Sequence, residues 1–127
     1  MRRPPPAKPE DAEEFFAGHP VGLEAFRRVH SILTGYGPCG LRVAKTQVGW
    51  ARRRGFAYLW MPDRWLKSTS TKVVLTIDLP RRDPSRRWKQ VVEPRPRLFT
   101  HHLELRSSGD IDDEVEQWLH EAYDAAA

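Results

Sequence analysis

The residues best suited to bind a ligand lie in the stretch TQVGWARRRGFAYLW, which spans 46–60. Trp50, Tyr58 and Trp60 offer flat rings, and the alternation along two strands predicts that they share one face of a sheet. Lysine and arginine side chains border this face. Stacking surfaces beside cations are typical of proteins that bind single-stranded nucleic acid. The predicted ligand-binding residues are Lys45, Trp50, Arg52, Arg54, Tyr58, Trp60, Asp78 and His102.

An acid–base pair is the alternative chemistry for the same region. Asp78 and His102 fall on two expected strands, which as neighbours would bring them together as in a small hydrolase-like enzyme. No nucleophile motif accompanies them, because Cys39 lies in a Gly-Pro-Cys-Gly turn with no recognisable surroundings. The sequence also has no phosphate-cradling glycine loop and no dinucleotide fingerprint. We therefore expect no cofactor and assign no catalytic residue.

The run His101-His102-x-Glu104 invites a metal-binding interpretation. In a strand, His102 and Glu104 share one face while His101 points to the opposite face. Two side chains make a poor metal site, and the sequence offers no third ligand at a suitable spacing. We therefore expect no metal site.

The stretch 46–65 is predicted to form a β-hairpin at the centre of a small sheet. Gly55 follows three arginines and is expected to supply the positive φ of the turn. In the second strand Phe56, Tyr58 and Trp60 are expected on one face, with smaller apolar residues on the other. A strand that is apolar on both faces should be covered on both. Helices cover one face, and the other is the predicted binding surface.

The remaining elements place this hairpin in an α+β domain. The expected elements are helices over 10–17 and 21–34, strands over 41–45 and 72–79, a polar loop over 67–71, a long connection over 81–97, a strand over 98–106 and a closing helix with Asp110 as its N-cap. This order predicts a single mostly antiparallel sheet of four to five strands, with the N-terminal and C-terminal helices on one face.

Length and composition predict one globular domain over 10–127, after a proline-rich tail over 1–9 that is expected to be disordered. The single cysteine excludes an intrachain disulfide and fits a reducing compartment. The N-terminus lacks the apolar run of a secretory signal, and no apolar stretch is long enough to span a bilayer. We therefore expect a cytoplasmic protein with no membrane partner.

The charge is unevenly distributed along the chain. Residues 42–97 hold 15 Lys and Arg against 4 Asp and Glu, whereas residues 98–127 hold 1 against 8. Two interpretations remain open, internal pairing of the basic middle with the acidic end, or an anionic partner.

Partner classes follow from these features. Nucleic acid or another anionic ligand is the leading expectation, through the aromatic face and the basic hairpin. The alternative is a homodimerisation or protein-interaction module, because an exposed apolar sheet face usually marks an interface.

Two segments, KTQVGWARRRGFAYLWMPDRW and LFTHHLELRSSGDIDDEVEQWLHEAYDAAA, carry a family resemblance. Through them the chain resembles the bacterial domain of unknown function 5655 over residues 14–126. The resemblance implies a Lys-Thr-x-Val strand opening, a Phe-Ala second strand, a Thr-His-His strand and a closing helix that ends in Ala-Tyr. The matching residues are Lys45, Thr46, Val48, Phe56, Ala57, Thr100, His101, His102, Trp118, Leu119, Ala122 and Tyr123. It implies the domain limits and no reaction.

Overall fold

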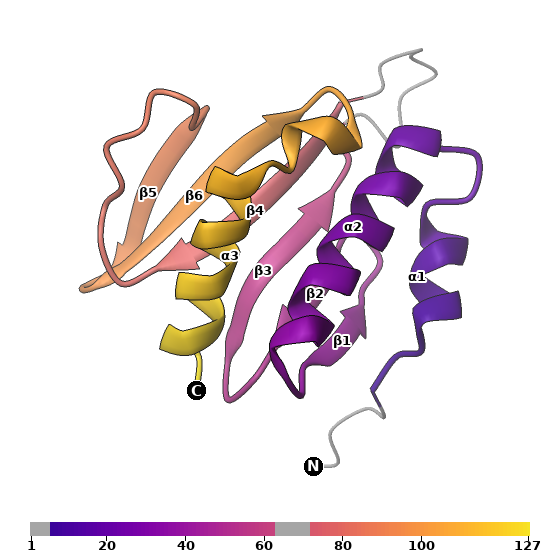
Figure 1. Cartoon of the computed structure of the whole chain (residues 1–127), viewed down its shortest axis with the longest axis horizontal. Coiled ribbons are helices and arrows are strands. Elements are labelled where there is room, and N and C mark those ends of the chain that lie inside the picture. The colour runs from indigo at the N-terminus through magenta and orange to yellow at the C-terminus, as the bar shows by residue number, and fades with distance from the viewer. Residues whose placement is uncertain (1–5, 63–71) are drawn as a thin grey trace.

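The structure is a computed structural model that describes residues 6–62 and 72–127. Within these ranges, three α-helices, one short 3₁₀ helix and six strands follow one another (Figure 1). The helices are α1 (Pro9–Phe15), α2 (Pro20–Tyr36), η1 (Ser108–Asp110) and α3 (Asp113–Ala125). The strands are β1 (Gly40–Val43), β2 (Val48–Ala51), β3 (Gly55–Trp60), β4 (Val73–Leu79), β5 (Gln90–Arg95) and β6 (Leu98–Leu105). The predicted α+β class is confirmed.

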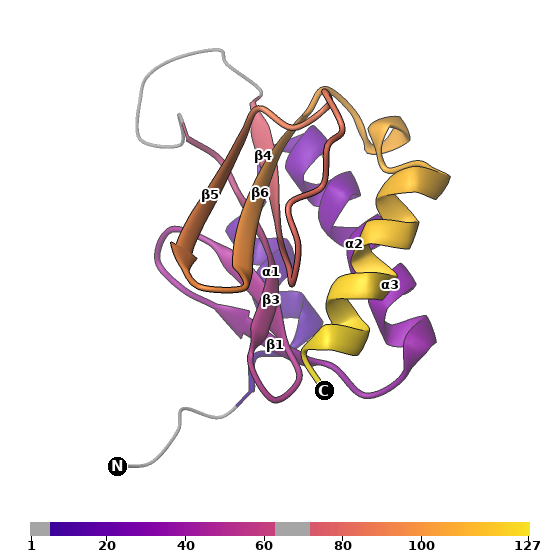
Figure 2. The same cartoon turned by 90° about the vertical axis from the view of Figure 1, so that its left-hand side faces the viewer.

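The six strands form one antiparallel sheet in the order β1-β2-β3-β4-β6-β5. Helices α2 and α3 lie against one side of the sheet (Figure 2). No helix of the described ranges lies against the opposite side, which we call the open face. A single antiparallel sheet with helices on one side was predicted, but the predicted count of four to five strands is wrong.

The strand that the sequence concealed is β5, which lies inside the expected connection over 81–97. It pairs with β6 at the sheet edge, with Val91 opposite His101 and Val92 opposite Thr100. Five of its six side chains are exposed, so no apolar alternation marks it. Pro94 lies within it, and proline is tolerated in a sheet mainly at edges and bulges. The connection is therefore a shorter loop followed by an edge strand.

The core lies between the sheet and helices α2 and α3. The helices bury stripes with helical spacing, which include Phe26, Val29, Leu33, Val115, Trp118, Leu119 and Ala122. The sheet side that they cover carries Leu41, Val48, Trp50, Leu59, Leu75, Ile77 and Leu103, all at most 4% exposed. Because each fully buried side chain of this size contributes about 1.5–3 kcal/mol, these two apolar surfaces hold the layers together.

The hairpin of β2 and β3 is confirmed, but a β-bulge changes which side chains share a face. Trp50 is opposite Ala57 whereas Ala51 is opposite Gly55, so Phe56 is the extra residue of the bulge. The Phe56 ring packs edge-on against Tyr123 of α3, with centroids 5.9 Å apart. The prediction that Phe56 shares a face with Tyr58 and Trp60 is therefore wrong, because the bulge shifts the alternation.

The start of α3 also differs from the prediction. Asp112 is the N-cap, and its carboxylate accepts the N–H of Val115 at 3.1 Å. Asp110 lies in the preceding 3₁₀ turn, where its carboxylate accepts the N–H of Arg106. The 3₁₀ turn moves the helix start past the predicted cap.

The N-terminal tail and one loop fall partly or wholly outside the described residues. Of the tail over 1–9, residues 1–5 lie outside them, whereas the N–H of Ala7 donates to the carbonyl oxygen of Leu41 at 3.0 Å and Pro9 begins α1. The expected loop over 67–71 also lies outside them. Among the helices that are described, none has the length and apolar character to cross a membrane.

Candidate functional site

One row of residues crosses the open face from edge to edge. The backbone register aligns, strand by strand, Arg42, Gly49, Tyr58, Thr76, His102 and Gln90. Trp60, Asp78 and Thr100 lie on the same face, because alternate residues of a strand share a side. The predicted separation of His101 and His102 onto opposite faces is confirmed, since His101 is opposite Ile77 and His102 is opposite Thr76.

The open face is hollowed where β3, β4 and β6 meet, over a volume of about 380 Å³. We call this hollow the open-face pocket, and its lining residues are Gln47, Tyr58, Trp60, Thr76, Asp78, Thr100 and His102. Four of the predicted residues, Tyr58, Trp60, Asp78 and His102, therefore come together. Small-molecule sites commonly have volumes of about 300–1,000 Å³, so the pocket is large enough for one planar group.

A hydrogen-bonded chain fixes two of the pocket's rings. The indole N–H of Trp60 donates to the hydroxyl of Thr76 at 2.9 Å. The same hydroxyl lies 2.8 Å from Nδ1 of His102. The Trp60 and His102 rings meet edge to face, with centroids 6.1 Å apart. Burial lowers the pKa of His102, against the opposing pull of the Asp78 charge, so the neutral imidazole is favoured.

Asp78 is the acidic group of the pocket. The Thr100 hydroxyl donates to Oδ1 of Asp78 at 2.7 Å. Burial raises the pKa of Asp78, although the Thr100 hydrogen bond and nearby positive charges oppose the rise. Asp78 bonds to Thr100 and His102 to Thr76, and among the described residues no hydrogen bond joins Asp78 directly to His102.

Tyr58 takes its position from two glycines. A Cβ added at Gly55 would lie 2.1 Å from the Tyr58 hydroxyl oxygen, and one at Gly49 would lie 2.9 Å from the ring. Gly55 does not have a positive φ, so the prediction that it serves the turn in that way is wrong. Its lack of a side chain instead leaves room for Tyr58. Burial, followed by the Asp78 charge, raises the pKa of Tyr58 and keeps its hydroxyl protonated.

Trp50 does not belong to this face, and its predicted place beside Tyr58 and Trp60 is wrong. It is opposite Leu41 and Ala57 in the sheet, on the helix-covered side, and is 1% exposed. Its indole N–H donates to Nδ1 of His30 in α2 at 3.1 Å. Trp50 and Trp60 of the hairpin thus lie on opposite faces of the sheet.

The arginines of the hairpin tip contact the C-terminal end of α3. Arg52 donates to the carbonyl oxygen of Tyr123 at 3.0 Å, and its guanidinium lies 4.0 Å from the centroid of the Tyr123 ring. Arg54 donates to the carbonyl oxygen of Ala125 at 3.2 Å, and the backbone N–H of Arg53 donates to Ala126. Cations at this end interact favourably with the helix dipole.

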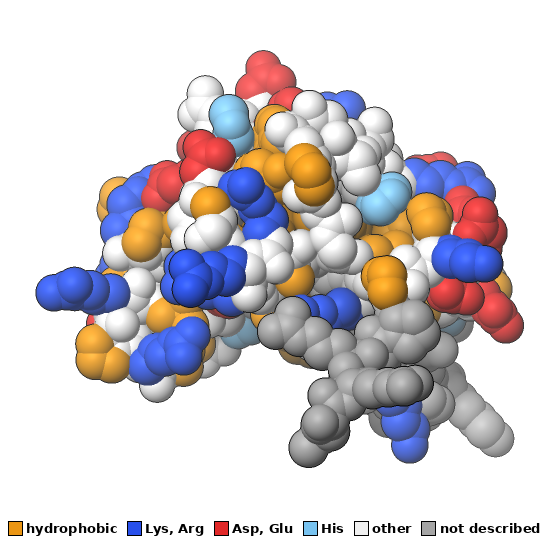
Figure 3. All heavy atoms as spheres, turned by 90° about the horizontal axis from the view of Figure 1, so that it is seen from below, with side chains coloured by type: hydrophobic (Ala, Val, Ile, Leu, Met, Phe, Trp, Pro, Cys, Tyr) orange, Lys and Arg blue, Asp and Glu red, His pale blue; other side chains and the backbone are white. Residues whose placement is uncertain are grey.

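Charge pairing within the chain offsets part of the uneven charge distribution. Arg81 binds Glu121 at 2.8 Å, and Arg87 binds Asp112 and Glu114 at 3.0 and 2.9 Å. Two arginines of the basic middle therefore pair with the acidic end of the chain. Lys and Arg side chains also gather where the β2–β3 and β5–β6 hairpins turn, as the view onto that end shows (Figure 3).

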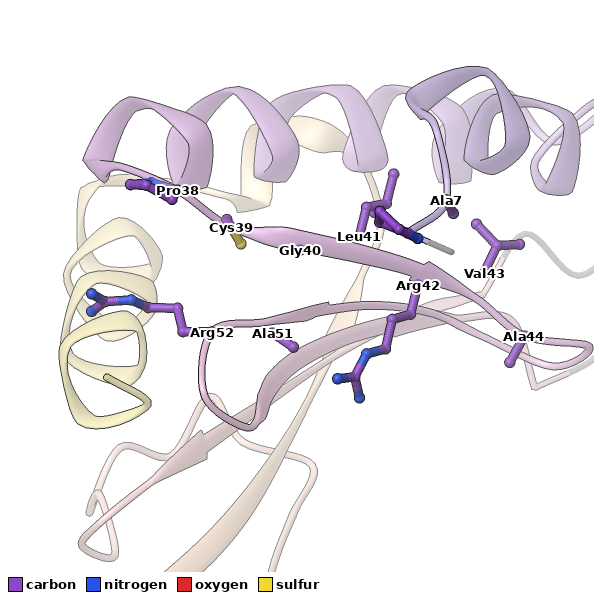
Figure 4. A pocket seen from close by; sticks show the side chains of 11 residues that line it. Ala7, Pro38, Cys39, Gly40, Leu41, Arg42, Val43, Ala44, Ala51 and Arg52 are labelled. Carbon is purple, nitrogen blue, oxygen red and sulfur yellow. The ribbon is translucent and has the colours of Figure 1, made fainter. Parts of the chain in front are cut away.

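Among the described residues, Arg42 and Lys45 are cations on the β1–β2 side of the open-face pocket. Arg42 follows the Tyr58 row on β1 and extends from the strand on the side away from the helices (Figure 4). The exposed Lys45 lies in the β1–β2 turn, two residues before the pocket residue Gln47. Neither side chain has a hydrogen bond or ion pair to another described residue. Both are therefore available to contact an anionic ligand.

A second hollow, of about 1240 Å³, follows the free edge of β1. Its lining includes Ala7, Cys39, Leu41, Val43 and Arg52 (Figure 4). Burial raises the pKa of Cys39 to about 11, despite a backbone hydrogen bond from Ala51 and the nearby Arg52. A thiol with this pKa is protonated and unreactive at neutral pH.

On the helix side, His101 and Asp83 form a buried polar cluster. The backbone N–H of Asp83 donates to Nε2 of His101 at 3.0 Å, so Nδ1–H of His101 donates to the carbonyl oxygen of Phe99. The Asp83 carboxylate accepts bonds from Arg81, the Ser85 N–H and the indoles of Trp88 and Trp118. Among the described residues, no three His, Cys, Asp or Glu side chains come together to hold a metal ion.

Sequence reasoning missed Gln47, Thr76, Thr100 and Arg42 as site residues. A signal for the two threonines existed, because Thr76 alternates with Asp78, and Thr100 with His102, along predicted strands. The place of Arg42 depended on the register of β1, which the sequence does not fix.

Fold and site together define an antiparallel α+β domain with helices on one side and a pocket of aromatic and polar side chains on the other. The chain belongs to the family described as Domain of unknown function (DUF5655), whose profile matches residues 12–126. This confirms the resemblance carried by the sequence. No curated protein and no solved structure matches the chain.

Proposed function

We propose that the domain is a non-catalytic binding module that holds single-stranded nucleic acid on its open face. The observation that supports this most is the open-face pocket, which is lined by the Tyr58, Trp60 and His102 rings together with the carboxylate of Asp78. A nucleobase is a flat heterocycle with a polar edge. It can lie against these rings and direct its N–H groups to the carboxylate, and each base that stacks in this way contributes about 1–3 kcal/mol.

The phosphate contacts come from the border of the pocket rather than from the hairpin tip. Arg42 and Lys45 are the candidates, because Arg52 and Arg54 are bonded to the end of α3. Tyr58 and Trp60 therefore remain the proposed stacking residues. The proposed phosphate contacts lie on the β1–β2 side of the sheet. A strand of nucleic acid lying along the row from Arg42 to His102 would contact both kinds of group.

The test is the binding of fluorescently labelled single-stranded oligonucleotides, measured by anisotropy over a range of salt concentrations. Two phosphate contacts predict a slope of log affinity against log salt of about −1.4, at about −0.7 per phosphate. The double substitution Arg42→Ala and Lys45→Ala should bring this slope close to zero. Trp60→Ala should weaken binding at every salt concentration by about 1–3 kcal/mol.

Arg28→Ala is the matched control. Arg28 is exposed on α2, in the layer on the opposite side of the sheet, and its loss removes one positive charge without touching the open face. This variant should bind like the unaltered protein. Equal weakening by Arg28→Ala and by the substitutions on the open face would reduce the binding to non-specific charge attraction, and an absence of binding at low salt would overturn the proposal.

A further inference from the structure

The hydrogen atom on the Thr76 hydroxyl determines which nitrogen of His102 carries a proton. Thr76 is 4% exposed, and its hydroxyl accepts the indole N–H of Trp60. A buried hydroxyl hydrogen requires an acceptor, and the partner in position to accept it is Nδ1 of His102 at 2.8 Å. Nδ1 of His102 is therefore unprotonated, and the neutral ring carries its hydrogen on Nε2. The ring of His102 thus offers the pocket one hydrogen-bond donor.

Asp78 offers the pocket only acceptors. One of its oxygens receives the Thr100 hydroxyl, and neither oxygen has another hydrogen bond to a described residue. An ionised carboxylate has about four lone-pair sites, so three remain for a ligand. Two adjacent N–H groups of a ligand can bond to such a carboxylate in parallel, in the bidentate geometry that gives the strongest pairs.

Asp78 and His102 lie diagonally across β4 and β6. Asp78 is opposite Thr100, and His102, two residues further along β6, is opposite Thr76. Diagonal neighbours in a sheet are about 7–8 Å apart at Cα, so one planar ligand can reach both side chains. Asp78 and His102 together therefore present a pair of acceptors beside one donor.

Among the four common bases, only guanine presents the complementary edge. Its N1–H and exocyclic 2-amino group are two adjacent donors, and its O6 next to them is an acceptor. Adenine, cytosine and uracil each lack a second donor next to the first. Resting on the proposed function, we infer that the open-face pocket selects guanine, with Asp78 accepting N1–H and the 2-amino group and His102 Nε2–H donating to O6.

The first experiment compares single-stranded pentanucleotides that differ only in a central guanine, inosine or adenine within a uracil background. Inosine lacks the 2-amino group alone. A hydrogen bond to a charged acceptor contributes about 1.5–3 kcal/mol, so guanine should bind about 10- to 150-fold more tightly than inosine. Asp78→Asn should remove this preference and leave weaker binding that no longer distinguishes the two. Equal affinities in the unaltered protein would overturn the inference and leave the proposed function standing, whereas no binding of any oligonucleotide would overturn both.

A guanidinium group also carries adjacent N–H donors, and argininamide serves as the competitor that detects it. Displacement of the guanine oligonucleotide by argininamide at equal or lower concentration would contradict nucleic acid as the ligand and indicate a basic peptide instead. The expected result is no displacement, because a guanidinium has no acceptor for His102.

The second experiment needs no ligand. Nitrogen-15 NMR of histidine-labelled protein at neutral pH should show His102 with an unprotonated Nδ1. In Thr76→Val, which has a similar shape without the hydroxyl, this preference should disappear. A protonated Nδ1 in the unaltered protein would overturn the donor assigned to His102, whatever the oligonucleotides do.

Discussion

His101 and His102 are neighbours in the chain and belong to two different regions of the molecule. His101 is 0% exposed on the helix side of β6, and both ring nitrogens have fixed backbone partners in Asp83 and Phe99. His102 faces the open-face pocket with Nδ1 engaged by Thr76. The first ring is protonated on Nδ1, and we infer that the second is protonated on Nε2, so the two rings differ in tautomer.

The two faces of the sheet differ in how far their polar groups are satisfied within the protein. On the helix side, the polar groups of the His101 and Asp83 cluster satisfy one another and stabilise the loop that leads into β5. On the open face, Trp60, Thr76 and Asp78 also have partners, but the pocket keeps acceptors and a donor for a ligand. The helix side should therefore govern stability, and the open face should govern binding.

The largest expected effect on stability is the loss of the Trp50 side chain, compared with the loss of Trp60 in the same hairpin. Trp50→Ala should lower the free energy of unfolding by about 3–5 kcal/mol, because it empties a fully buried site between β2 and α2. Trp60→Ala should cost clearly less, since Trp60 is partly exposed, while it weakens oligonucleotide binding by about 1–3 kcal/mol. Urea unfolding measures the first effect and anisotropy the second. Equal losses of stability would contradict the division between faces.

Asp83→Asn tests the buried cluster of His101 and Asp83 and should have the next largest effect on stability. The amide keeps the shape but removes the charge that four donors share, and its NH₂ faces other donors. We expect a loss of about 3 kcal/mol in the free energy of unfolding. Asp124→Asn, an exposed carboxylate on the last turn of α3, is the control and should change stability by less than about 0.5 kcal/mol. Similar values for the two variants would contradict the structural role of Asp83.

Part of the pH dependence of stability follows from His30, His101 and Asp83. Burial lowers the folded-state pKa of His30 and His101 below 6.5, so the unfolded chain binds more protons just below that pH. Stability should therefore fall as the pH falls below about 6.5. Burial favours a higher pKa for Asp83, but its hydrogen bonds outweigh this and lower it below 3.8. Its contribution is complete above 3.8 and is lost as the pH falls through the lower folded value.

Urea midpoints between about pH 8 and pH 5 measure the histidine part of this dependence. His101→Gln should flatten the curve, because the amide keeps one donor and one acceptor without titrating. A midpoint that is constant or rises on acidification would show that the histidines are not held neutral. That result would remove the contrast in tautomers between His101 and His102.

The smallest expected effect on stability is that of Gly55→Ala. The new methyl group would lie 2.1 Å from the Tyr58 hydroxyl oxygen, so the Tyr58 side chain must shift from its position in the pocket. We expect a loss of about 1 kcal/mol in stability and a much larger proportional loss of oligonucleotide affinity. In a Tyr58→Phe background the same substitution should cost less, because the closest atom is gone. Additive effects of the two substitutions would contradict the packing of Tyr58 over Gly55.

Much of the fold was predictable because apolar periodicity encodes it directly. Apolar residues at helical spacing indicated α2, and apolar residues at every second position indicated β4. Alternating aromatic residues indicated the hairpin of β2 and β3. The exposed edge strand β5 was not predictable in this way, because an edge that faces solvent on both sides carries no apolar pattern. The bulge at Phe56 was also hidden, since one inserted residue leaves the composition unchanged while it reverses the facing of the side chain.

The site was predictable in part for the same reason. Alternation along single strands placed Tyr58 with Trp60, and His102 opposite to His101. Trp50 was misplaced because its face depends on the register between β2 and β3. The contacts of Arg52 and Arg54 with the end of α3 were not predicted, because their partners lie 71 residues away in the sequence. Pairings over such sequence separations are set by tertiary packing, which local pattern does not report.

The most direct test of the account compares the indole N–H signals of Trp50 and Trp60 by NMR while a guanine-containing single-stranded oligonucleotide is added. The account predicts that the Trp60 signal shifts with saturation, together with backbone amides of β3, β4 and β6, and that the Trp50 signal stays in place. Shifts confined to the helices, or a Trp60 signal unchanged at saturating oligonucleotide, would contradict the open face as the binding surface.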